Sequence, residues 1–288
     1  MLKSIYALIG VMVIIFILSS LPDALHDKNG RISFTPSSSW DSMTTYIAGI
    51  ANGESFQYIQ GKNRVRNFIE DIGKFFITSF LYLFISAICI VLISLMMSIW
   101  QALSKREWVK DIVGFCGFMP DFVLILFLQM GVVFLYKTTG TSVAMVASKS
   151  FAEPAIFLPL VTLTIIPAIY LIRTLSEKTY DVLTEEYILT AKSKGLKKMT
   201  IILQHVIRNV LPYLKADLHG MMAIMMGNLF IVEYLFNIPG VTKLIFSEAD
   251  YQFNLTVNGL LTLVLIYILL YWGIRAFVYG LERIFAYG

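Results

Sequence analysis

The stretch "FFITSFLYLFISAICIVLISLMMSIW", residues 75–100, decides the fold, because it holds no charged side chain from one end to the other. A helix needs about 20 mostly apolar residues to cross a hydrocarbon core of roughly 30 Å. This run is therefore long enough to cross a membrane as a single helix.

The rest of the chain has the same character. Of its 288 residues, 57% are hydrophobic and 15% are charged, whereas about a quarter of the residues in a water-soluble domain are charged. Six apolar runs are long enough to be spans, so we expect an all-α polytopic membrane protein with six transmembrane helices. The runs lie at approximately 4–21, 75–100, 112–136, 155–173, 210–236 and 256–280.

The first run could be a secretory signal, because Lys3 precedes an apolar stretch that ends at Ser19 and Ser20. No clear small-residue cleavage site follows, so we expect an uncleaved anchor. The predicted organisation is an anchor at 1–21, an extracytoplasmic loop at 22–74, a five-helix core at 75–280 that includes a cytoplasmic segment at 174–209, and a cytoplasmic tail at 281–288.

Basic residues in the short loops predict the orientation of the spans, because cytoplasmic loops carry an excess of lysine and arginine. The second and fourth loops are basic, and the third and fifth are not, so both termini are predicted to be cytoplasmic. The basic loops hold Lys105, Arg106, Lys110, Lys178, Lys192, Lys194, Lys197, Lys198 and Arg208; the other two short loops hold Lys137, Lys149 and Lys243.

Cysteine and histidine are sparse. Cys89 and Cys116 both lie in apolar runs, and the three histidines are scattered along the chain. We therefore expect no disulfide and no metal site, and we expect no nucleic-acid partner.

The stretch "EEYILTAKSKGLKKMTIILQHVIRNVLP", residues 185–212, is markedly polar and basic between two apolar runs. Helix-forming residues occupy 185–194, Gly195 interrupts them, and a second amphipathic stretch occupies 197–208 before Pro212 opens the next span. A glycine flanked by lysines suits a helix end, where it can adopt positive φ. We expect two short helices joined at Gly195.

Two interpretations of this segment remain open at the level of composition. Ala191 and Gly195 are four residues apart, which predicts a flat strip where another protein can approach closely. Alternatively, the segment is a basic loop held by anionic lipid.

Three motifs in order carry a resemblance to a known family. "EYILTAKSKG" followed by "LQHVIRNVLP" resembles the cytoplasmic signature of permease subunits of ATP-binding-cassette importers, in the branch for oligopeptides, dipeptides and nickel. "LPLVTLTIIPAIYLIRTLSEKTYDVLTEEYI" before it, and "GNLFIVEYLFNIPGVTKLIFSEA" with "DYQFNLTVNGLLT" after it, are similar to the same branch. The resemblance covers roughly residues 65–272. Of the two alanines usual in the signature only Ala191 is present, so the chain looks like a divergent member.

The resemblance implies a permease subunit that passes peptides or a related small solute inward by alternating access, in a bacterial cytoplasmic membrane. It also implies a second permease subunit, cytoplasmic ATPase subunits and an extracytoplasmic substrate-binding protein as partners. The helix near residues 186–195 would be the coupling helix that docks on the ATPase. The residues implied in coupling are Glu186, Tyr187, Ala191, Lys194 and Gly195.

No phosphate-binding Gly-x-x-x-x-Gly-Lys-Ser/Thr motif occurs in the sequence. We therefore expect no cofactor and no enzymatic activity in this chain, with ATP and magnesium bound by the separate ATPase.

Polar residues within the apolar runs are candidates for a translocation pathway, because a charge at the membrane centre costs roughly 2.5–3.5 kcal/mol. Structural contacts between helices are the alternative reading. Lys215 lies near the start of its run, where it can extend to the interface. The pathway candidates are Asp121, Asp217, His219, Asn228 and Glu233.

The sequence "NIPGV" at 237–241 predicts an outer turn, with Pro239 at its first central position and positive φ at Gly240. This turn could face a binding protein or only close the span onto the surface.

Two further functions are compatible with the sequence. One is a secondary transporter with Asp217 and His219 as a proton relay, and the other is a non-transporting membrane scaffold.

Overall fold

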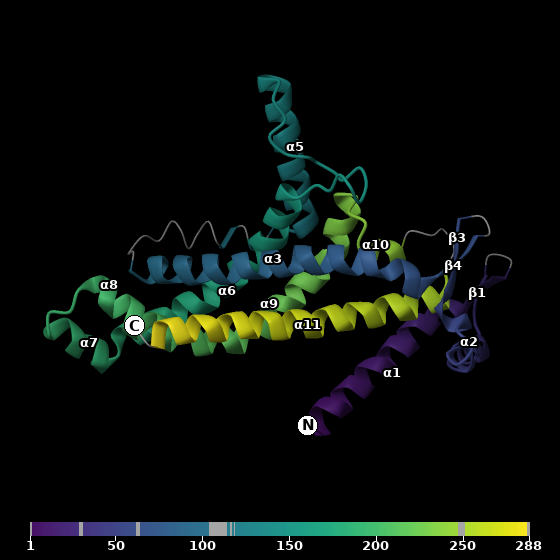
Figure 1. Ribbon diagram of the computed structural model, residues 1–288, viewed down its shortest axis with the longest axis horizontal. Helices are drawn as coiled ribbons and strands as arrows, with labels where there is room; N and C mark the ends of the chain where they lie inside the picture. The colour runs from purple at the N-terminus through teal and green to yellow at the C-terminus, as the bar shows by residue number, and fades with distance from the viewer. Residues whose placement is uncertain are drawn as a thin grey trace. The chain divides into compact units, whose positions relative to one another are not determined.

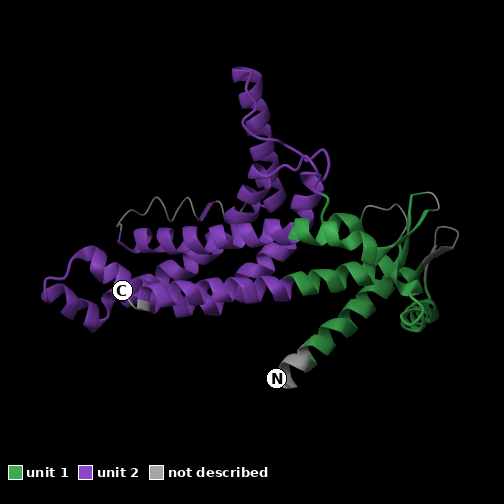
Figure 2. Cartoon of the chain, viewed as in Figure 1, with its two compact units in different colours: residues 1–79, 239–266 green, residues 80–238, 267–288 purple. Residues whose placement is uncertain are grey.

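The computed structural model describes residues 2–28, 31–61, 64–103, 114–115, 117, 119–246 and 251–286. The chain forms two compact units, shown in Figure 2: unit 1 holds residues 1–79 and 239–266, and unit 2 holds 80–238 and 267–288. Two long helices, α3 (Phe68–Leu103) and α11 (Phe253–Ala286), which are labelled in Figure 1, contribute residues to both units (Figure 2).

Five helices are long and apolar enough to cross a membrane. They are α3, α5 (Asp121–Thr139), α6 (Phe157–Thr184), the continuous helical stretch Lys198–Leu235, and Phe253–Phe285 of α11. The first predicted run is also helical, as α1 (Leu2–Ala24). Its apolar part, Leu8–Ala24, is shorter than the 18 residues that the five spans reach or exceed. The chain is thus a mainly helical membrane protein, as predicted, and five of the six predicted spans meet the length criterion.

The predicted loop at 22–74 has secondary structure of its own. Strand β1 (Leu25–Lys28) pairs antiparallel with β2 (Arg31–Phe34), and β3 (Gln57–Gln60) pairs antiparallel with β4 (Arg64–Asn67). Between the hairpins lie α2 (Pro36–Gly49) and the 3-10 turn η1 (Glu54–Phe56). These two hairpins depart from the all-α expectation, although helices still account for most of the described residues.

Unit 1 is held together around α2. The Tyr46 ring lies 5.4 Å from the Phe16 ring and 5.8 Å from the Phe253 ring, centroid to centroid. Its hydroxyl donates to Asn258 Oδ1 over 2.7 Å, and Asn258 Nδ2 donates to the Ser55 carbonyl over 2.8 Å. Because Asn258 is buried, these bonds satisfy an amide that would otherwise be costly to bury.

Unit 2 is built on the contact between α6 and α9 (Ile207–Leu235). Both helices turn leucine-rich faces inward, and Gly220 lets them approach closely, since a Cβ there would lie 2.4 Å from Tyr170 Oη. Helix α3 adds a small polar residue at its contact with α6, where Ser94 Oγ donates to the Ala168 carbonyl over 3.4 Å. Small residues at such contacts are typical of helices packed within membranes. The fully buried side chains on α6 and α9 include Leu163, Leu171, Leu175, Leu211, Leu214, Leu218 and Met221.

Helix α5 begins later than predicted. The expected span at 112–136 is replaced by a helix that starts at Asp121, directly after Pro120 in extended conformation. Proline lacks the N–H that a preceding turn would need, so it favours a helix start here. Asp121 therefore sits in the first turn, not at mid-span beside a proline kink, and Ile125 is the only described residue of α5 that is fully buried.

The segment after α6 contains α7 (Glu186–Ser193), α8 (Lys198–Thr200) and the π-helix η2 (Ile201–Val206), which runs directly into α9. The prediction of a separate second short helix before Pro212 was wrong. Buried residues such as Ile202, Val206 and Val210 continue one inward face from η2 into α9. Pro212 lies inside α9 and does not open it.

Candidate functional site

Helix α7 ends at Ser193 and is followed by a hydrogen-bonded cap at Gly195. Gly195 has a φ of +76°, as predicted for a helix end. Its N–H donates to the Lys192 carbonyl over 3.0 Å, and the Leu196 N–H donates to the Ala191 carbonyl over 3.3 Å. This pair of bonds is the Schellman motif, which satisfies the last carbonyl groups of a helix.

Helix α7 has one buried and one exposed side. Ile188 and Ala191 are buried, at 0% and 5% exposure, on the side that contacts α6 and η2. Glu186, Leu189 and Lys194 are exposed. The expected flat strip of Ala191 and Gly195 is therefore corrected: only Gly195 is on the surface, because Ala191 shares the inward face of Ile188 three residues away.

Tyr187 lies at the edge of the exposed side. Its ring is 6.4 Å from the ring of His205 on η2, and its side chain remains 41% exposed. Partial burial raises the pKa of its phenol, and the negative charge of Glu185 raises it further. Tyr187 thus stays neutral at physiological pH and presents an aromatic surface next to charged neighbours.

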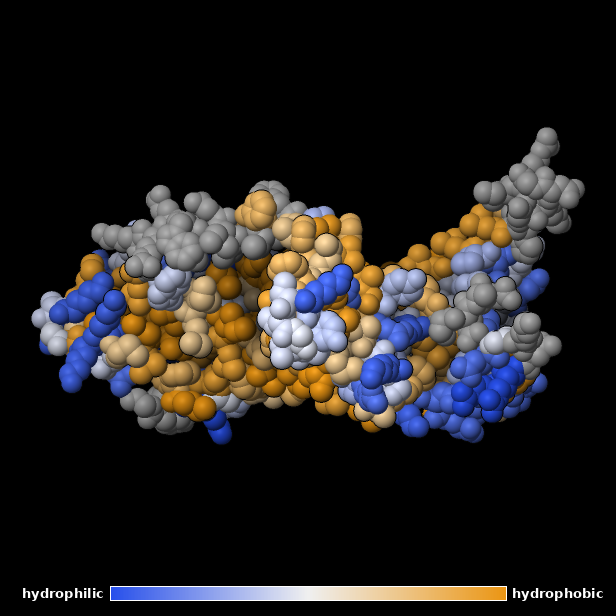
Figure 3. Space-filling model, turned by 90° about the horizontal axis from the view of Figure 1, so that it is seen from above, coloured by the Kyte–Doolittle hydropathy of each residue, from blue (hydrophilic) through white to orange (hydrophobic). Residues whose placement is uncertain are grey.

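Basic residues gather around this helix. Lys192, Lys194, Lys197 and Lys198 are all exposed. Figure 3 shows hydrophilic residues at the end of unit 2 that carries α7 and α8, beside a largely hydrophobic surface. The other basic residues of the orientation argument, Lys105, Arg106 and Lys110, lie outside the described residues.

His219 belongs to an aromatic cluster between α9 and α11. Its ring stacks on Tyr271 at 4.4 Å between centroids, and its Nδ1 atom lies 2.7 Å from the Tyr267 hydroxyl. Arg275 lies over the Tyr271 ring at 5.8 Å. His219 and Arg275 are both exposed in this chain.

Asp217 does not join this cluster. It acts electrostatically on Tyr170 of α6, whereas His219 contacts α11. Residues two positions apart on a helix point to different sides. The structure therefore does not bring Asp217 and His219 together as neighbours. Lys215 forms an ion pair with Glu282 of α11. Its side chain therefore has a protein partner, whereas the sequence predicted only that it extends to the membrane–water interface.

Two of the remaining pathway candidates, Asp121 of α5 and Asn228 of α9, contact each other. Asp121 forms a side-chain hydrogen bond with Asn228, which is the structural contact that the sequence left as an alternative. Glu233 is 1% exposed, so it is not an interfacial carboxylate. Nearby, Gln129 Nε2 donates to the carbonyl of Leu235 over 3.2 Å.

The outer turn differs from its prediction. Positive φ occurs at Asn237, at +54°, while Gly240 is extended with a φ of −112°. The Asn237 N–H donates to the Tyr234 carbonyl over 3.2 Å and the Ile238 N–H to the Glu233 carbonyl over 2.8 Å. Asn237 therefore caps α9 as Gly195 caps α7, and Pro239 follows as a helix stop.

Several of these partners were missed by sequence reasoning. Tyr267, Tyr271 and Arg275 recur at intervals of four, which places them on one face of a helix and is a signal available in the sequence. The partner of Lys215, Glu282, carries no comparable signal, because 67 residues separate the two.

The fold and this site define a class of protein: a polytopic helical membrane protein with a short, lysine-flanked helix outside its spans. Residues 94–287 match the family described as the binding-protein-dependent transport system inner membrane component. The match covers more than half of the chain, and the chain belongs to this family.

Individual relatives share less of their length. Over 179 residues the chain is 24% identical to the metal-staphylopine import system permease protein CntB of Staphylococcus aureus, covering 61% of this chain and 55% of CntB. It is 36% identical to the dipeptide transport system permease protein DppB of Bacillus subtilis over 86 residues, covering 30% of this chain and 28% of DppB. It is 30% identical to the putrescine export system permease protein SapB of Escherichia coli over 95 residues, covering 33% and 30%. The matches thus span about half of CntB and less than a third of DppB and SapB.

Proposed function

We propose that this chain is a transmembrane permease subunit of an ATP-driven importer for peptides or a related small solute, in a bacterial cytoplasmic membrane. In this role it forms part of the translocation pathway and works by alternating access. ATP and magnesium bind to a separate ATPase, and α7 is the element that docks on it. An extracytoplasmic binding protein delivers the solute.

The observation that carries the proposal is the way α7 is held. A coupling element must be fixed to the spans and still present a free surface to its partner, because a loose element would not transmit a rigid movement. Ile188 and Ala191 fix α7 from inside, and the cap at Gly195 fixes its end. Tyr187 and Leu189 remain exposed, at 41% and 53%.

A second permease subunit is supported by the exposed cluster at His219 and Arg275. A guanidinium group that faces lipid at membrane depth is costly. The cluster therefore fits a surface covered by another protein or facing an aqueous pathway. The proposed direction, import, rests on the resemblance and on the name of CntB, which is a permease of an import system. SapB, by contrast, is named as a permease of an export system.

Co-purification tests the proposal. Full-length tagged protein, extracted from its native membrane in mild detergent, should bring down an ATPase with a Walker motif and a second multi-span permease. Leu189→Asp should weaken recovery of the ATPase by about thirtyfold, since loss of an interface anchor costs about 2 kcal/mol.

Phe34→Asp is the matched control, because Phe34 is 62% exposed on β2 and lies outside α7 and outside the spans. It should leave recovery unchanged. The proposal fails if the wild-type chain recovers no ATPase, or if solute uptake continues without ATP and stops when the proton gradient collapses.

A further inference from the structure

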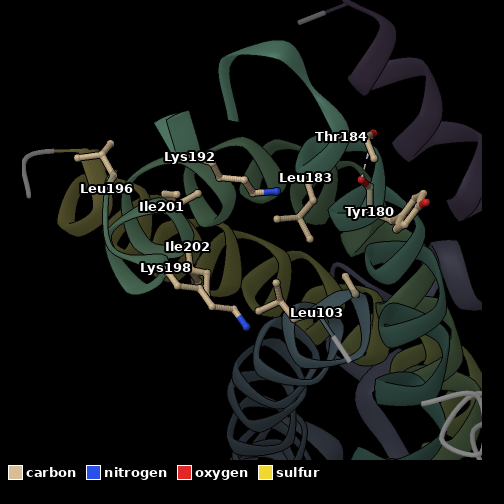
Figure 4. A pocket seen from close by; sticks show the side chains of 10 residues that line it. Leu103, Tyr180, Leu183, Thr184, Lys192, Leu196, Lys198, Ile201 and Ile202 are labelled. Carbon is tan, nitrogen blue, oxygen red and sulfur yellow. Dashed lines mark hydrogen bonds between the residues drawn. The ribbon is translucent and has the colours of Figure 1, made fainter. Parts of the chain in front are cut away.

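A groove of about 470 Å³ opens beside α7 in unit 2 (Figure 4). Its walls come from the ends of α3 and α6 on one side, and from α7, α8 and η2 on the other. The volume falls within the range of roughly 300–1,000 Å³ that small-molecule sites occupy. The lining side chains that matter here are Leu103, Leu183, Lys192, Lys198, Ile201 and Ile202.

The lining combines aliphatic walls with two positive charges. Figure 4 shows the amino group of Lys192 directed toward Leu183, and that of Lys198 directed toward Leu103. No acidic residue is among the described residues that line the groove. Within the described part of the chain, the ion pairs involve other basic residues. The groove therefore suits an amphiphile that carries a negative charge.

The α3 wall of the groove lies at the depth of the head-group layer of a bilayer, and the α6 wall lies beyond that layer. Leu103 lies three residues beyond the apolar run 75–100, and Leu183 lies ten residues beyond the run 155–173. At about 1.5 Å per helical residue, these positions are roughly 5 Å and 15 Å past the ends of the spans. The head-group region begins where the hydrocarbon core ends and extends about 5–8 Å on each side. Leu103 therefore lies within this region, and Leu183 lies beyond it on the aqueous side.

We propose that this groove binds the head group of an anionic phospholipid. Lys192 and Lys198 contact the phosphate, and Leu103 and Ile202 contact the glycerol and the first carbons of an acyl chain. A zwitterionic lipid would bring a positive group toward the two lysines, and a free phosphate would leave the aliphatic walls uncovered. The bound lipid would lie between α7 and the ends of α3 and α6, and would pack against the side of α7 that lines the groove. This inference goes beyond transport and holds whether or not α7 docks on an ATPase.

The experiment uses the full chain in mild detergent, titrated with fluorescent phosphatidylglycerol, phosphatidylcholine or, as a competitor, inorganic phosphate. Each lysine near an anionic lipid contributes about fivefold in affinity. Lys192→Gln with Lys198→Gln should therefore weaken phosphatidylglycerol binding by about twenty-five-fold. Lys194→Gln with Lys197→Gln removes the same charge from exposed positions outside the groove and should change binding by no more than about twofold.

Leu183→Trp supplies a second test, because it fills the groove and leaves the charge unchanged. It should also abolish the preference for phosphatidylglycerol over phosphatidylcholine. If circular dichroism shows that the lysine variant does not fold, Leu183→Trp alone tests the proposal. The proposal is overturned if the two lysine pairs weaken binding equally, which would indicate general surface attraction. It is also overturned if phosphatidylcholine binds as tightly, or if inorganic phosphate displaces the lipid at equal concentration.

Discussion

The backbone N–H of Leu196 donates to the carbonyl oxygen of Ala191 over 3.3 Å, which joins the exposed turn at Gly195 to the buried side of α7. Ala191 lies against the interior of unit 2, and Leu196 lines the groove beside α7. A movement imposed on the turn would therefore reach the spans through the backbone of α7 as well as through its side chains.

Substitution of Gly195 should loosen this turn. Gly195→Ala places a Cβ at a φ of +76°, a conformation that costs about 1–2 kcal/mol for residues other than glycine. Because trypsin cuts at the neighbouring lysines, limited proteolysis should become roughly 5- to 30-fold faster. Gly195→Asn should behave almost like the wild type, since asparagine tolerates this conformation. Equal cleavage of all three proteins would contradict the cap.

Ile188 should anchor α7 much more strongly than its neighbour. Ile188→Ala removes a fully buried side chain and should destabilise the packing of α7 by about 2–5 kcal/mol. The Leu189 side chain, by contrast, is exposed, so Leu189→Ala should have a much smaller effect. Hydrogen exchange of the α7 amides measures both effects. The assignment of the buried side is wrong if Leu189→Ala exposes these amides more than Ile188→Ala does.

The hydroxyl of Tyr267 should stabilise the contact between α9 and α11. Tyr267→Phe keeps the ring and removes the hydrogen bond to His219, which should lower the free energy of unfolding by about 1 kcal/mol. Tyr279→Phe is the control, because Tyr279 contacts Lys215 and Arg283 through its ring, which the substitution keeps. Denaturant titration in micelles compares the two. A larger loss in Tyr279→Phe would contradict this role for Tyr267.

Unit 1 should lose stability at high pH through Tyr251. Burial raises the pKa of Tyr251 to about 12, and the charge of Asp23 adds to this. The neutral phenol is the form that the folded state favours, so its contribution is complete below the unfolded pKa of about 10 and is lost as pH rises from 10 toward 12. Hydrogen exchange of unit 1 across this range should show a steeper loss of protection in the wild type than in Tyr251→Phe. Identical pH profiles would contradict the prediction.

The positions of most spans could be predicted from the sequence, because a long uncharged apolar run such as 75–100 has few alternatives to a membrane helix. The end of α7 at Gly195 was predicted for a similar reason, since glycine adopts positive φ at low cost. The continuous path from Lys198 into α9 was missed, because Pro212 usually marks a helix start and the π-turn of η2 leaves no recognised sequence signal. The start of α5 was placed too early, because apolar residues before Pro120 continued the run.

The sequence by itself determined that this chain is a membrane protein with a basic segment between two spans, since hydropathy and charge act locally along the chain. Only the tertiary structure decided which side of α7 is free, that His219 contacts α11 whereas Asp217 acts electrostatically on α6, and that Lys192 and Lys198 share one groove. These relationships join residues on separate helices, and they depend on how each helix is rotated against its neighbours. That rotation is set by the packing of many small contacts, such as Gly220 against Tyr170, which no single stretch of sequence contains.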